Sequence, residues 1–121
     1  MAKILVVDDE EVMRTALAIM LRRDGHAVTL AAGARDALSS FDDGGFDVVV
    51  TDIMMPEIDG LELIRRLRAR SAEIPIIAMS GVRVGSLSEA QALGATRSVA
   101  KPFAPPEFRA ILRAVLTNRA A

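Results

Sequence analysis

The stretch VTDIMMPEIDG, from Val50 to Gly60, decides how the rest of the chain is interpreted. The valines Val48–Val50 lead into Asp52, and the chain then enters a loop marked by Pro56 and Gly60. A continuous run of β-branched residues is typical of a strand buried on both faces of a sheet. A charge at the end of such a strand needs a reason, because a carboxylate is costly to bury without a partner.

Similar apolar runs recur along the chain, with room for a helix between them. The clearest are Ile4–Val7 and Ile76–Met79, and the weaker strand candidates are Ala27–Ala32 and Ser98–Ala100. Between these runs, apolar residues recur at spacings of three and four, which is the pattern of a helix with one buried face. The predicted helices are Val12–Leu21, Ala34–Phe41, Leu61–Arg70, Ser88–Leu93 and Phe108–Leu116.

Strand and helix therefore alternate along the whole chain. This order predicts an α/β fold in which five parallel strands form one sheet, with helices on both faces and right-handed crossovers between strands. No linker, repeat or low-complexity segment interrupts the alternation. Residues 1–121 are therefore expected to form one domain.

The composition excludes several classes of function. The 121 residues include no cysteine, so a disulfide framework and a thiolate metal site are both excluded. The net charge is −1 and no basic run occurs, so nucleic acid is not an expected partner. No apolar run approaches the length of a membrane helix, and the first residues show neither the apolar h-region nor the cleavage site of a signal peptide. We expect a soluble, cytoplasmic protein that does not contact a membrane.

Polar side chains stand where the predicted strands end. Asp8 and Asp9 follow the first strand, Asp52 the third, Ser80 the fourth and Lys101 the fifth. The carboxyl ends of parallel strands meet at one edge of the sheet, and the ligands of open α/β sheets bind there. We therefore expect these side chains to meet in one crevice.

The chemistry of such a crevice points to a metal ion and a phosphoryl group. Three neighbouring carboxylates raise one another's pKa values, and Mg²⁺, which prefers oxygen ligands, relieves that repulsion. Asp52 would attack phosphorus as a nucleophile, while Lys101 neutralises the charge of the phosphoryl group and Ser80 donates a hydrogen bond to it. Taken singly, each residue also has a structural interpretation as a helix N-cap, a turn residue or a solvated lysine.

Four motifs carry a resemblance to a known family: VVDDE (Val6–Glu10), TDIMMPEIDG (Thr51–Gly60), SG (Ser80–Gly81) and KPF (Lys101–Phe103). Together they resemble the receiver domain of two-component response regulators, in particular the single-domain, chemotaxis-regulator-like members. The resemblance covers essentially the whole chain. It implies a flavodoxin-like (βα)5 fold with strand order 2-1-3-4-5.

The resemblance also implies roles for individual residues. It makes Asp52 the phosphoacceptor and Asp9 a direct Mg²⁺ ligand, with Asp8 acting through water and the backbone carbonyl of Met54 completing the ligand set. Lys101 would pair with the phosphoryl group.

Further roles concern the switch and its supporting loops. Ser80, followed by Gly81, would be the switch hydroxyl. The Lys101–Pro102 bond would be cis, as X–Pro bonds permit. Pro56 and Gly60 would shape the loop after the acceptor. The family usually has an aromatic residue where this chain has Ser98, so we expect the switch to propagate differently or to couple more weakly to its output.

Two positions that tune hydrolysis of the phosphoryl group in this family are Met54 and Val82 here. Both side chains are apolar and cannot orient an attacking water molecule by hydrogen bonding. We therefore predict a comparatively long-lived phosphoryl group.

The predicted function is that of a single-domain response regulator. It would accept a phosphoryl group on Asp52 from the phosphohistidine of a sensor histidine kinase or a histidine phosphotransfer protein, with Mg²⁺ as cofactor. It would be no enzyme beyond its own phosphorylation and slow dephosphorylation. The signal would pass to a downstream target protein by contact or by onward phosphotransfer, from a monomer or a phosphorylation-dependent dimer.

Two alternatives remain. A phosphohydrolase that works through an aspartyl phosphate would need a second acid two residues after the nucleophile, and Met54 stands there instead. A phosphate-independent, receiver-like interaction module would keep the fold without the chemistry. Only Ser98 favours this module, whereas the presence of Asp52, Asp9 and Lys101 opposes it.

Overall fold

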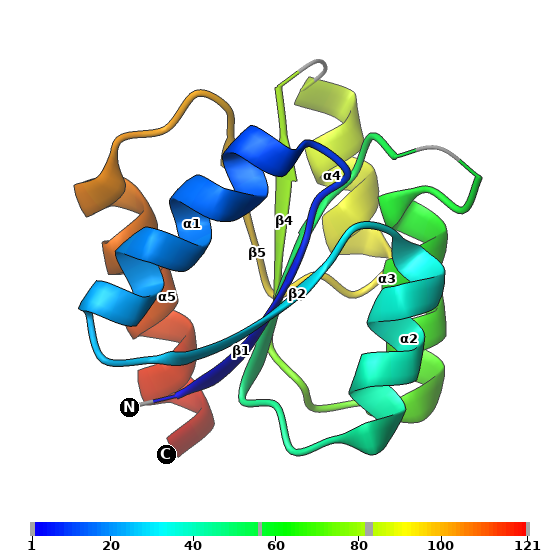
Figure 1. Ribbon diagram of the computed structural model, residues 1–121. Coiled ribbons are helices and arrows are strands. Elements are labelled where there is room, and N and C mark those ends of the chain that lie inside the picture. The colour runs from blue at the N-terminus through cyan, green and yellow to red at the C-terminus, as the bar shows by residue number, and fades with distance from the viewer. Residues whose placement is uncertain (1, 56, 82–83, 121) are drawn as a thin grey trace.

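The computed structural model describes residues 2–55, 57–81 and 84–120, and strands alternate with helices throughout these ranges (Figure 1). The strands are β1 (Lys3–Val7), β2 (Ala27–Ala31), β3 (Val48–Asp52), β4 (Ile76–Ser80) and β5 (Arg97–Ala100). The helices are α1 (Glu11–Arg23), α2 (Ala34–Asp43), α3 (Gly60–Arg70), α4 (Val84–Ala92) and α5 (Pro105–Ala120). The predicted alternation is thus confirmed.

All strand pairs are parallel, and the strands lie in the order β2-β1-β3-β4-β5, as predicted. The order reverses between β1 and β3, because the chain moves from β1 to one side for β2 and returns to the other side for β3. The register places Val7 beside Thr51 and Asp52 beside Met79, so that β1, β3 and β4 end along one edge. Open α/β sheets bind their ligands at such a reversal.

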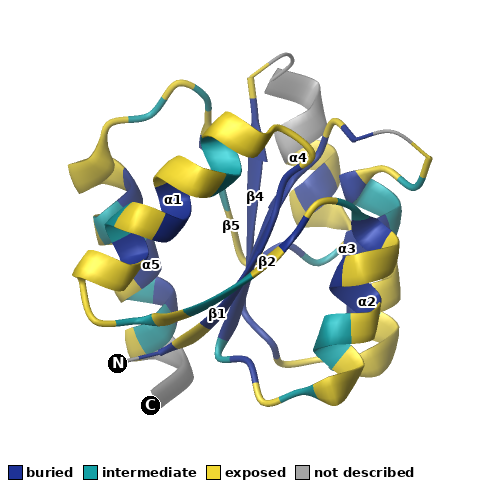
Figure 2. Ribbon diagram, in the orientation of Figure 1, coloured by how far each residue is buried: buried dark blue, intermediate teal, exposed yellow. Residues whose placement is uncertain are grey.

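Helices cover both faces of the sheet, with α1 and α5 on one face and α2, α3 and α4 on the other (Figure 1). Alternate residues of each strand point to opposite faces. Ile4 and Val6 accordingly belong to the core beneath α1 and α5, and Leu5 and Val7 to the core beneath the other helices. Both faces of the central strands are buried (Figure 2), which explains why they are continuous apolar runs.

β3 and β4 extend further than the apolar runs predict. Asp52 and Ser80 are the last residues of these strands, not the first residues after them, and they are only 4% and 2% exposed. The sheet therefore holds both residues through its backbone pairing. A side chain in this position moves less than one on a free loop.

α5 is longer than its predicted range, Phe108–Leu116, because it runs over Pro105–Ala120. α4 begins at Val84, before its predicted start at Ser88, and ends at Ala92 instead of Leu93. The sequence at its start contains Gly85 and Ser86, which are weak helix formers, so the sequence pattern does not predict a helix there. Ala90, fully buried in the core beneath α4, shows that packing holds this helix in place. No helix within the described ranges is long and apolar enough to cross a bilayer.

Candidate functional site

The acidic pocket is a cavity of about 260 Å³ at the edge where the strand order reverses. Loops that follow β1, β3, β4 and β5 contribute to it. Its lining residues are Asp9, Glu10, Asp52, Met54, Gly81 and Lys101. Of the residues predicted to meet here, Asp9, Asp52 and Lys101 line the cavity. Asp8 and Ser80 are buried and do not line it, but both contact Lys101.

The ammonium group of Lys101 forms ion pairs with three carboxylates at the pocket. Its Nζ atom lies 3.0 Å from Oδ2 of Asp8, 3.5 Å from Oδ1 of Asp52 and 3.8 Å from Oε1 of Glu10. The side chain of Asp8 is fully buried and that of Lys101 is only 12% exposed. A buried carboxylate without a partner costs several kcal/mol, so this ion pair is what permits the burial of Asp8.

The pKa values of Asp52 and Lys101 are both raised, but from different causes. Burial raises the pKa of Asp52, Lys101 lowers it, Asp8 raises it and a backbone hydrogen bond from Met54 lowers it, so that the pKa lies above its ordinary value. Burial lowers the pKa of Lys101, but the hydrogen bond to Asp8 and the nearby negative charges outweigh burial and raise it. Lys101 is therefore cationic at neutral pH, while the charge of Asp52 is incompletely compensated.

Three acidic side chains are placed to share a metal ion. Carboxylate oxygens of Asp8, Glu10 and Asp52 all lie within 4.8 Å of one another. This all-oxygen set fits Mg²⁺. Asp9, the predicted direct ligand, lines the pocket but is exposed and stands outside this group. The strand-end pattern does not point to Glu10, because this residue follows the two aspartates at the end of β1, although it is the last residue of the VVDDE motif.

A hydrogen-bond network holds the turn between β1 and α1. Oδ1 of Asp8 accepts the backbone N–H of Glu10 at 2.9 Å, which leaves Oδ2 for Lys101. Arg14 donates from Nη1 to the backbone carbonyl of Asp8 at 2.8 Å. Glu10, not Asp8 or Asp9, is the N-cap residue of α1, and its side chain makes no capping hydrogen bond. The simple N-cap interpretation of the two aspartates is therefore wrong.

The end of β4 brings Ser80, its last residue, and Gly81, which follows it, next to Lys101. Ser80 is buried, and its carbonyl oxygen accepts the backbone N–H of Lys101 at 2.9 Å. Gly81 lines the pocket, and the peptide bond between Lys101 and Pro102 is cis, as the resemblance implies. Val82, one of the residues predicted to tune hydrolysis, lies outside the described ranges.

Ser98 is half-buried in β5, on the strand that ends near Lys101. Its hydroxyl oxygen accepts a hydrogen bond from Nε2 of Gln91 in α4 at 3.2 Å. A polar link between α4 and β5 thus occupies the position where the family usually carries an aromatic side chain.

Gly60 is required by the close approach of α3 to the end of β3. A Cβ atom at this position would lie 2.6 Å from the Cα atom of Ile53 and closer still to the carbonyl oxygen of Asp52. The backbone N–H of Gly60 donates to the carbonyl of Ile53 at 2.8 Å, and Asp59 caps α3 by accepting the N–H of Glu62 at 2.9 Å. Pro56, predicted to shape the same loop, lies outside the described residues.

Fold and site together define a class: a flavodoxin-like α/β domain with a carboxylate–lysine pocket at its switch point. The model of the response regulator receiver domain matches residues 4–113. The chain belongs to this family. Receiver domains of two-component response regulators are generally signalling modules without an enzymatic activity of their own.

Relatives and solved structures agree with this assignment. The chain is 37% identical over 118 residues to the sensory transduction protein RegX3 of Mycobacterium tuberculosis, covering 96% of this chain and 51% of that protein. It is 40% identical over 117 residues to the response regulator MprA of Mycolicibacterium vanbaalenii, covering 94% and 50%. The chain thus spans about half the length of these curated relatives.

Among solved structures, the chemotaxis protein CheY4 of Vibrio cholerae superposes with a TM-score of 0.89 at 33% identity, covering 95% of this chain and 98% of that one. The similarity over almost the full length of both chains confirms the predicted fold and strand order.

Proposed function

We propose that the domain is a phosphorylation-driven switch in which Asp52 accepts a phosphoryl group from the phosphohistidine of a sensor kinase or a histidine phosphotransfer protein. One observation carries the proposal. The carboxylate of Asp52 stands at the end of a buried strand, 3.5 Å from the ammonium group of Lys101 and within 4.8 Å of the oxygens of Asp8 and Glu10.

The transfer needs a positioned carboxylate and nearby positive charge. A carboxylate oxygen of Asp52 attacks phosphorus, and the bond from phosphorus to the histidine nitrogen breaks, with its electron pair leaving on the imidazole. Lys101 then exchanges part of its contact with Asp52 for the phosphoryl oxygens. Asp52, Asp8 and either Glu10 or Asp9 would hold Mg²⁺, which would add further neutralisation of phosphoryl charge when bound. The Met54 carbonyl remains our proposed backbone ligand.

The output of the switch follows from the class of protein. We propose that the phosphorylated domain, as a monomer or a dimer, acts on a downstream protein by contact or passes the phosphoryl group onward. The link between Gln91 and Ser98 lies between α4 and β5, so a movement at Lys101 would reach α4 through this polar contact.

The test is the intact mass of the protein after incubation with acetyl phosphate. Wild type is expected to gain one phosphoryl group in the presence of Mg²⁺ and none in EDTA, and Asp52→Asn should gain none in either buffer. Asp43→Asn, which changes an exposed acid at the end of α2, is the matched control and should behave as wild type.

A folded wild-type protein that gains no mass, while a known receiver domain does so in parallel, would favour the phosphate-independent interaction module. The decay of the adduct tests the predicted slow hydrolysis. Met54 lines the pocket and is 51% exposed, with no polar group on its side chain to hold a water molecule. A lifetime of only seconds would contradict that prediction.

A further inference from the structure

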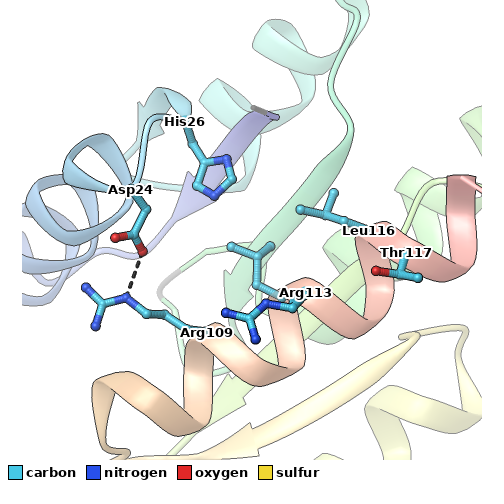
Figure 3. Close-up of a pocket in the computed structure, with 7 residues that line it drawn as sticks. Asp24, His26, Arg109, Arg113, Leu116 and Thr117 are labelled. Atoms are coloured by element: carbon cyan, nitrogen blue, oxygen red, sulfur yellow. Dashed lines mark hydrogen bonds and ion pairs between the residues drawn. The ribbon is translucent and has the colours of Figure 1, made fainter.

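A second cavity, of about 540 Å³, lies between α5 and the turn from α1 to β2 (Figure 3). It shares no lining residue with the acidic pocket. One side consists of α5 residues at helical spacing. Arg109 and Arg113 are one turn apart, Leu112 lies between them in the sequence, and Leu116 lies one turn after Leu112. His26 stands on the other side. We call this cavity the α5 groove.

The charges of the α5 groove are unbalanced. Arg109 donates from Nε to Oδ2 of Asp24 at 2.7 Å, and this ion pair crosses the groove (Figure 3). Arg113 is exposed and forms no ion pair with any residue in the described part of the chain. Because Asp24 compensates Arg109, the guanidinium of Arg113 leaves the groove with one positive charge that no other lining residue compensates.

His26 adds a second hydrogen-bond donor. Its Nδ1 accepts the backbone N–H of Ala2 at 3.0 Å, so the proton of the neutral ring is on Nε2. The ring reaches into the groove across from Arg113 (Figure 3). The N–H of the imidazole and the planar guanidinium are both suited to a carboxylate, which accepts two parallel hydrogen bonds from arginine.

The base of the groove is apolar. Leu112 is 3% exposed and belongs to the core beneath α1 and α5, and Leu116 packs partly buried against that core. A ligand that covers the exposed part of Leu116 gains from apolar burial. Asp24 contributes a negative charge beside Arg109, which disfavours a multiply charged anion such as phosphate. The chemistry therefore selects one negative charge joined to an apolar body.

We propose that the α5 groove binds a small monocarboxylate with a short aliphatic chain. The carboxylate accepts hydrogen bonds from the guanidinium of Arg113 and from Nε2 of His26, and the aliphatic chain lies on Leu116. The volume of the groove is within the usual range of roughly 300–1,000 Å³ for small-molecule sites. This proposal is independent of phosphorylation at Asp52.

The test is a titration of the ¹⁵N-labelled protein with hexanoate, followed by two-dimensional NMR. We expect saturable shifts at His26 and along residues 109–117, and no saturation with hexan-1-ol, which keeps the aliphatic chain but lacks the charge. Arg113→Gln should weaken hexanoate binding at least about tenfold, because hydrogen bonds to charged groups are the strong ones. Arg97→Gln, at an exposed arginine of β5, is the matched control and should bind as wild type.

Three results would overturn the proposal. The first is a set of shifts that stay linear with hexanoate concentration. The second is an affinity of Arg113→Gln for hexanoate equal to that of wild type. The third is saturable binding of the peptide acetyl-Leu-Glu-Leu-amide without binding of hexanoate, which would assign the groove to a partner protein. If circular dichroism shows that Arg113→Gln does not fold, Arg113→Lys replaces it. Lysine keeps the charge and loses the paired donors, so its affinity should lie below that of wild type.

Discussion

At the scale of single residues, the fold holds several negative charges close together in the acidic pocket. Asp8, Glu10 and Asp52 stand close together around the one ammonium group of Lys101. Burial and, to a lesser degree, the negative charge of Asp8 raise the pKa of Asp52, and Lys101 offsets this only in part. A site that attracts a further cation or an electrophilic phosphoryl group is therefore less stable without it.

We predict that Asp52→Asn raises the stability of the metal-free domain at pH 7. The pKa of Asp52 in the folded state lies above its ordinary value of 3.8, so the folded protein binds the proton more tightly than the unfolded chain. Ionisation then costs folding stability as the pH rises from 3.8 through the folded-state pKa, and the cost persists above it. Asparagine removes this cost, and Lys101 keeps its contact with Asp8.

Thermal unfolding in EDTA between pH 4 and pH 8 measures the effect. The difference in Tm between Asp52→Asn and wild type should be smallest at pH 4, increase with pH and then level off. Adding Mg²⁺ should narrow the difference, since an ion bound to the folded state stabilises it and wild type binds the ion better. A variant that is less stable than wild type at pH 7 and gains relative stability toward pH 4 would contradict the prediction.

At the scale of elements, the start of α3 positions the end of β3. The first helical residue, Gly60, packs directly on the backbone of Asp52 and Ile53. The side-chain cap by Asp59 fixes the direction of the helix there. The strand and the helix thus meet backbone to backbone, which keeps the acceptor side chain in place.

We predict that Gly60→Ala destabilises the domain by about 3 kcal/mol, the upper end of the cost of overpacking. Glycine-to-alanine changes at compatible positions stabilise by about 0.4–1 kcal/mol, so the sign is reversed here by the clash with the backbone of β3. Urea unfolding measures the loss.

Gly81→Ala is the matched control, because a Cβ atom at Gly81 would lie 3.4 Å from the Cβ atom of Lys101, a tight but tolerable contact. Its cost should stay below about 1 kcal/mol. Equal stability of the two variants would show that α3 can move away from β3 without loss.

At the scale of the whole molecule, Arg68 joins three segments at the edge of the sheet opposite the acidic pocket. Its guanidinium donates to the carbonyl oxygens of Gly94 at 2.9 Å, Ile74 at 2.6 Å and Ser71 at 3.2 Å. These residues lie after α4, before β4 and after α3. One side chain of α3 therefore holds both loops that lead into β4 and β5.

We predict that Arg68→Ala destabilises the domain by about 2 kcal/mol, because it leaves partly buried carbonyls without a donor. Arg70→Ala, which removes an exposed ion pair of 2.8 Å with Asp42, should cost less than about 1 kcal/mol. Since Arg68 is remote from Asp52, the mass gained with acetyl phosphate should be unchanged at a temperature where both variants are folded. Unfolding by urea gives the first quantity, and a similar loss in the two variants would refute the special role of Arg68.

The sequence by itself determined the alternation of elements and most of the residues that meet at the acidic pocket. Both follow from local patterns, since buried parallel strands are continuous apolar runs and their carboxyl ends share one edge. Asp9, Asp52 and Lys101 were predicted in this way, and the family resemblance supplied Gly81 and the strand order. The start of α4 was predicted wrongly because its first residues are weak helix formers, and packing against the sheet overrides that preference.

Only the tertiary structure decided the arrangements that depend on distances between elements. The place of Glu10 among the carboxylates, the clash that forbids a side chain at Gly60 and the position of His26 across the groove from α5 all depend on how separate segments of the chain approach one another. Periodicity shows that a residue is buried, but it does not show which neighbour that residue meets. The neighbour is set by the packing of helices on the twisted sheet.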